Sequence, residues 1–157
     1  MPYFLQPLLR IRTMREDRAS GELVAAKRDL AIAEEALAER RKELEEWEAT
    51  KEDRRDRIYA AVMGRTVSRD HLDMVNEGVA RIDEEGALKA DNVKRAEAER
   101  ARREEAAEEA RRNLFQATKN RMKIDEHKAV WKAEDVAWQD AREEGELEDF
   151  TVRKEEI

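Results

Sequence analysis

The chain of 157 residues has no cysteine, only two prolines and five glycines, and an aromatic content of 5%. Without cysteine it can form neither a disulfide nor a thiolate metal site. With so little proline, almost nothing in its interior breaks a helix. No stretch approaches the ~20 apolar residues of a membrane-spanning helix. These absences favour long helices that do not insert into a membrane.

The N-terminal stretch from Met1 to Leu9 holds no basic residue, and Pro7 breaks its short apolar run. A secretory signal has a basic segment followed by an apolar one. We therefore expect no signal peptide and a cytoplasmic location.

Charged residues make up 45% of the chain, the net charge is −7 and the pI is about 5.2. So much charge has to face water, which leaves apolar surface for a stripe but not for a globular core. The acidic balance disfavours nucleic acid and anionic lipid as partners. The composition is typical of long helices or a coiled coil.

Apolar residues recur at heptad spacing in two long runs. A spacing of three and four residues places side chains on one seam of a helix, and a sustained repeat winds that seam around a partner helix. The first run has Leu23, Leu30, Leu37 and Leu44, and the second extends from Leu72 to Trp138. The pattern predicts an all-α fold, a long antiparallel two-helix coiled-coil hairpin; an intermolecular coiled coil is the alternative.

Residues 64–68 predict the turn. Gly64 suits the left-handed position after a helix, Ser68 can cap the next one, and Val67 can pack on Leu72. We predict a single hairpin domain over residues 1–157, with helix one at about 7–63, helix two at about 69–145, and a frayed acidic tail at 146–157.

Folding the chain back at this turn predicts which residues face each other. Ile58 should face Leu72, and Trp47 should lie near Ile82 to Gly86, where a bulky ring opposite a glycine forms a knob and a hole. The seam also contains seven cations, which should keep stability modest: Lys51, Arg54, Lys89, Arg100, Arg103, Arg121 and Lys128.

Helix two is the longer arm, so roughly its last 20 residues should lack a partner within the chain. This stretch includes Trp131, Val136 and Trp138. Uncovered apolar patches mark protein contacts. The apolar N-terminal residues either pack on the region from Leu114 to Ile124 or form a second docking surface: Tyr3, Phe4, Leu5, Leu8, Leu9 and Ile11.

Nothing in the sequence predicts catalysis, a cofactor or a metal. The two histidines, His71 and His127, do not have metal-ligand spacing, and a predicted rod offers no converging elements to complete a site. The many carboxylates are expected on solvated faces rather than in acid–base pairs. No glycine-rich phosphate loop is present.

Three segments, in order along the chain, resemble the type III secretion stalk proteins of the SctO/YscO type, which are related to the flagellar protein FliJ. They are the opening segment from Leu8 to Ala19, the central segment from Ile58 to Ser68 followed by Leu72-Asp73, and the acidic segment from Glu143 to Phe150.

The resemblance implies a helical hairpin whose terminal end enters the hexameric export ATPase and whose turn end contacts the cytoplasmic ring of the export gate. It also implies a link to secretion chaperones. Carried onto this chain, it places six residues at the ATPase: Leu8, Leu9, Arg10, Arg12, Arg15 and Arg18. It places five near the gate: Val62, Met63, Val67, Leu72 and Val75.

We add Trp131 and Trp138 to the ATPase contacts, because the stripe that bears them is predicted to lack a partner. The chain is then expected to be a non-enzymatic monomer at the cytoplasmic face of the inner-membrane secretion apparatus. The alternative is an unrelated cytoplasmic coiled-coil scaffold, which should form a dimer or a larger assembly.

Overall fold

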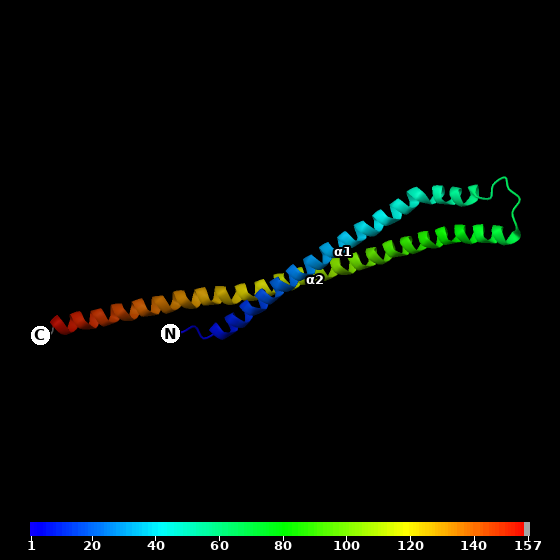
Figure 1. Ribbon diagram of the computed structural model, residues 1–157. Helices are drawn as coiled ribbons and strands as arrows, with labels where there is room; N and C mark the ends of the chain where they lie inside the picture. Colours follow the sequence, from blue (N-terminus) through cyan, green and yellow to red (C-terminus); the bar gives the residue numbers. More distant parts are fainter. Residues whose placement is uncertain (156–157) are drawn as a thin grey trace. The chain divides into compact units, whose positions relative to one another are not determined.

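The computed structural model describes residues 1–155 and contains two long helices (Figure 1). Helix α1 spans Gln6–Ala60 and α2 spans Arg69–Glu155. The described part of the chain contains no strand. The predicted fold class, an all-α helical hairpin, is confirmed.

The segment between the helices is longer than predicted, because α1 ends at Ala60 and not near Met63. One helix-type hydrogen bond follows the end of α1, because the amide of Met63 donates to the carbonyl of Tyr59 at 2.9 Å. Gly64 then adopts φ = 72°, as expected of a residue in the left-handed position. The prediction of that conformation is confirmed, and only the helix boundary was wrong.

Helix α2 begins with the predicted cap. The amide of His71 donates to Ser68 Oγ at 3.2 Å, which satisfies one of the four amides left free at a helix start. Asp70 adds a carboxylate to the first turn, where the helix dipole favours negative charge.

The predicted end of helix two at Gly145 was wrong, because α2 continues to Glu155. One glycine costs a helix only ~1 kcal/mol relative to alanine, and no proline follows it. The Arg142–Glu146 pair (3.1 Å) spans the glycine, and Arg153 and Lys154 lie in the last turn. Residues 156 and 157 of the predicted frayed tail lie outside the described residues.

Packing divides the chain into two units, each containing part of both helices. Unit 2 is Val24–Glu109 and includes the turn. Unit 1 is Met1–Leu23 together with the chain from Ala110 onward.

In unit 2 the seam side chains are buried between α1 and α2, and ion pairs flank them. Arg41 pairs with Glu97 at 3.2 Å and Arg54 with Glu85 at 2.9 Å. The two helix segments lie side by side on either side of the turn (Figure 1). The buried apolar residues of this unit are Ala33, Leu37, Val75, Ile82, Val93 and Ala107.

A tryptophan ring opposite a glycine fixes the register of unit 2. The Trp47 ring occupies the space beside Gly86, and a Cβ added to Gly86 would overlap three atoms of that ring. This confirms the predicted knob and hole. Nearer the turn, the side chain of Ile58, which was predicted to face Leu72, lies beside Gly78.

In unit 1 the N-terminal part of the chain packs along α2. Arg121 Nε lies 2.5 Å from the carboxylate of Glu16, and Arg12 donates to the carbonyl of Asn120 at 2.7 Å. The buried apolar residues here are Tyr3, Ala19, Leu23 and Ile124.

The seam cations are largely paired. Like Arg54 and Arg121, Arg100 and Arg103 each reach an acid of the facing helix, Glu34 and Asp29 respectively. These pairs remain accessible to solvent, and pairs of this kind contribute little to stability.

Candidate protein-interaction sites

The predicted contact residues fall into two groups that belong to different units. The terminal set lies in unit 1 and the turn set in unit 2. The terminal set is Leu8, Leu9, Arg10, Arg12, Arg15, Arg18, Trp131 and Trp138. The turn set is Val62, Met63, Val67, Leu72 and Val75.

The turn set is only partly available to a partner. Met63 is 74% exposed, Leu72 is exposed, and Val62 and Val67 are half-buried. Val75 is 8% exposed, so it is a core residue of unit 2. Its prediction as a contact residue conflicts with this burial, because its heptad position faces the seam.

The stripe at Trp131 was predicted to lack a partner within the chain, and this was wrong. The ring of Tyr3 lies 5.2 Å from that of Trp131, and its hydroxyl is 2.7 Å from His127 Nδ1. Phe4 adds an edge contact to His127. Tyr3 is only 5% exposed, so this aromatic cluster joins the segment before α1 to α2.

The aromatic cluster also answers the question of the N-terminal apolar patch. Tyr3 packs on α2, as one alternative held, but on residues 127–131 and not on the region from Leu114 to Ile124. Phe4 and Ile11 remain exposed, so a docking role for them stays a prediction.

The other members of the terminal set lie along the first turns of α1. Leu8 and Leu9 are half-buried. Arg12 is held by the Asn120 carbonyl, while Arg10, Arg15 and Arg18 are exposed. Three cations of this set therefore face solvent.

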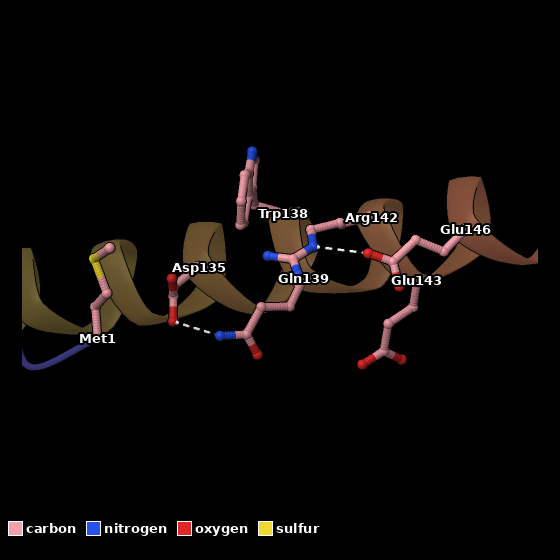
Figure 2. Close-up of a pocket in the computed structure, with 7 residues that line it drawn as sticks. All are labelled: Met1, Asp135, Trp138, Gln139, Arg142, Glu143 and Glu146. Atoms are coloured by element: carbon pink, nitrogen blue, oxygen red, sulfur yellow. Dashed lines mark hydrogen bonds and ion pairs between the residues drawn. The ribbon is translucent and has the colours of Figure 1, made fainter.

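Trp138 lies on an open groove of about 640 Å³ (Figure 2). Trp138 is 63% exposed, and the Arg142 guanidinium lies 5.8 Å from the centroid of its ring. Arg142 also pairs with Glu146, and Gln139 donates to Asp135 at 3.1 Å. The groove is lined by Met1, Asp135, Trp138, Gln139, Arg142, Glu143 and Glu146.

Beyond Trp138 the sequence interpretation missed a second exposed apolar group, consisting of Leu147, Phe150 and Val152. Because the helix was predicted to end at Gly145, these three residues were assigned to a frayed tail. The sequence carries a signal for one of the three, because the steps of three and four that include Trp131 and Trp138 reach Val152, whereas Leu147 and Phe150 lie off that register.

The electrostatics of both units consist of surface pairing. The hydrogen bond from Arg103, above all, lowers the pKa of the Glu99 carboxyl. The hydrogen bond to Glu16 likewise raises the pKa of the Arg121 guanidinium. Within residues 1–155, no three His, Cys, Asp or Glu side chains converge to hold a metal. Neither described helix is long and apolar enough to cross a membrane.

Comparison with known proteins identifies one family. The family model described as "Type III secretion protein YscO" matches residues 5–153, which is nearly the whole chain. No curated protein sequence matches.

One solved structure has a similar fold, and it is described as a YscO homologue, CT670, from Chlamydia trachomatis. The TM-score is 0.76 and the identity 21%, over 96% of this chain and 92% of that one. This similarity supports the helical hairpin fold.

Proposed function

Because the chain belongs to the YscO family of type III secretion proteins, we propose that it is the non-enzymatic central stalk of a bacterial type III export apparatus. It links the hexameric export ATPase to the ring of the export gate, as a monomer in the cytoplasm at the inner membrane. Escort of secretion chaperones is a secondary role that we propose with it.

The observation that supports this proposal is the separation of the two contact sets. The terminal set, with its exposed arginines and Trp138, belongs to unit 1, and the turn set, with Met63, belongs to unit 2. A protein that joins two partners needs two chemically different surfaces. Here the first combines the exposed arginines of α1 with the Trp138 ring of α2, which Asp135, Glu143 and Glu146 flank, while the second is a small apolar surface at the turn.

We assign the ATPase contact to Leu8, Leu9, Arg10, Arg15, Arg18 and Trp138, and the gate contact to Val62, Met63, Val67 and Leu72. Trp131 and Arg12 support the first surface from within, because Tyr3 covers one and Asn120 holds the other. Val75 supports the second surface from the core of unit 2.

Co-purification of the chain with the export ATPase and a gate subunit of the same organism tests the proposal. We expect Trp138→Ala to weaken ATPase capture and leave gate capture unchanged, and Met63→Asp to have the opposite effect. Val24→Ala, at an exposed position of α1 in neither set, is the control. Wild-type chain that captures neither partner contradicts the proposal.

A further inference from the structure

The packing register of α2 continues beyond the part of the helix that the rest of the chain covers. Counted from Leu72 in steps of three and four, the seam passes through Gly86 and Trp131 and continues to Trp138, Gly145 and Val152. Yet every residue from 136 to 155 is exposed. Figure 1 shows this last part of α2 extending past the N-terminal segment.

Two glycines on this seam have opposite surroundings. Beside Gly86 the space is filled by the ring of Trp47, and an added Cβ would overlap it. At Gly145 an added Cβ would meet nothing within 4 Å. Gly145 is therefore an open notch, with Trp138 and Val152 one heptad away on either side.

Backbone geometry does not account for glycine at this position. Gly64 is the one described glycine with positive φ, so Gly145 has the ordinary helical backbone that any residue adopts. A glycine in an exposed helix costs ~1 kcal/mol relative to alanine. A side chain that enters the notch from outside the chain would explain the choice, as Trp47 does at Gly86.

The charges around the notch point to a cationic partner. Residues 136–155 contain seven Asp or Glu and three Lys or Arg. Asp135, Glu143 and Glu146 line the groove beside Trp138. Within unit 2, ion pairs cross the same seam in both directions: Arg41–Glu97 and Arg54–Glu85 have the cation on α1, and Arg100–Glu34 and Arg103–Asp29 have it on α2. Charge pairing across this seam is therefore part of how it binds a helix, and beyond residue 135 the acids outnumber the cations.

We propose that residues 135–152 of α2 dock one basic α-helix of another protein, which places a large apolar side chain in the notch at Gly145. The docked helix continues the packing along the seam of α2, beyond the residues that the N-terminal segment of the chain covers. Its Lys and Arg side chains meet Asp135, Glu143 and Glu146. This is the docking of an amphipathic helix along a matching apolar stripe. This inference rests on the proposed function in one respect, because it takes the export ATPase as the protein that supplies the basic helix.

Gly145→Ala separates a role in binding from a role in folding. The added methyl favours the helix, so the thermal unfolding temperature should stay equal or rise. The same methyl fills the notch, so binding should weaken at least tenfold. Gly21→Ala is the matched control, because Gly21 is an exposed helical glycine with open space around it. It should give the same gain in helix without a loss of binding.

Affinity is measured in two arms on the full chain. One arm uses the export ATPase of the same organism. The other uses a designed helical peptide with Leu at its seam positions, one central Trp, and Lys and Arg at its flanks. A version with Ala in place of the Trp controls for charge alone. We expect the Trp peptide to bind the wild-type chain at least tenfold more tightly than the Ala peptide does. The Gly145→Ala chain should not show this difference between the two peptides.

The two arms distinguish the possible failures. If the ATPase binds wild type and Gly145→Ala equally and the peptide discriminates neither variant, the docking surface is wrong while the stalk proposal stands. If the ATPase never binds but the Trp peptide requires Gly145, the stalk proposal fails and the docking surface stands. A wild-type dimer in sedimentation that Gly145→Ala abolishes would make a second copy the occupant and overturn the inference.

Discussion

Trp47 in unit 2 and Trp138 in unit 1 are the same residue type on the same kind of stripe, in opposite circumstances. The ring of Trp47 fills the space at Gly86, and its Nε1 is buried without a hydrogen-bond partner. Trp138 stands open to solvent beside Arg142. The heptad period locates a stripe, but what covers the stripe decides whether its tryptophan supports the fold or is free for a partner.

Trp131 is an intermediate case. The heptad period alone groups it with Trp138, but Tyr3 covers it. A residue outside any heptad thus converts a predicted docking position into part of the fold.

The largest difference in the free energy of unfolding is expected between alanine substitutions of the two tryptophans. Because it removes a half-buried ring from a fitted site, Trp47→Ala should lower the free energy of unfolding by about 3 kcal/mol. Trp138→Ala should change it by less than about 0.5 kcal/mol, as surface substitutions do. Urea unfolding followed by circular dichroism measures both. Equal losses would mean that the exposed ring also packs within the fold.

Gly86→Ala tests the fit of the Trp47 ring from the facing helix, α2. Its methyl should overpack the site against Trp47 and cost about 1–3 kcal/mol. In a Trp47→Ala background the clash is gone, so the same change should stabilise the helix by up to about 1 kcal/mol. A double-mutant cycle by thermal unfolding tests this reversal of sign. The same destabilisation in both backgrounds would show that the ring does not occupy the glycine space.

The contact of Tyr3 with α2 above Trp131 should contribute less to the free energy of unfolding. Tyr3→Phe keeps the ring stack and removes the hydroxyl that bonds His127, at a cost of about 1 kcal/mol. Tyr59→Phe, on the exposed side of α1, is the control and should cost less than about 0.5 kcal/mol. Thermal unfolding of the two variants checks the difference, and no difference would mean that the hydroxyl gains nothing from His127.

The smallest effect is expected at the charged edge of unit 2. The Arg103 hydrogen bond holds the pKa of Glu99 below its usual value. A depressed folded-state pKa gives stability that is present above the unfolded pKa and lost as the pH falls through the folded pKa. Carboxyl NMR titration should show the Glu99 midpoint moving up in Arg103→Gln, and moving up less in Arg102→Gln. Equal shifts in the two variants would rule out Arg103 as the main cause.

The local signals in the sequence predicted the helices and much of their packing. Gly64, the Ser68 cap and the Trp47–Gly86 fit follow from backbone freedom, unsatisfied amides and side-chain volume. Each depends on a few neighbouring residues or on one heptad count, so reasoning from sequence can reach it.

Four features could not be reached in this way. The helix boundary before Gly64 and the shift of Ile58 to Gly78 depend on how the turn winds. The continuation of α2 past Gly145 depends on a balance of about 1 kcal/mol between one glycine and its helix-forming neighbours. The cover of Trp131 depends on Tyr3, which shows no period. Unfolding of the two units as one domain stays a prediction.

Site-specific photo-crosslinking in the assembled secretion apparatus tests whether the two contact surfaces bind two different partners. A photoreactive residue at Trp138 and another at Met63 report on the two surfaces in the same assembly. We expect the Trp138 position to crosslink to the export ATPase and the Met63 position to crosslink to the export gate. Crosslinks from both positions to the same protein, or from neither position to these partners, would contradict it.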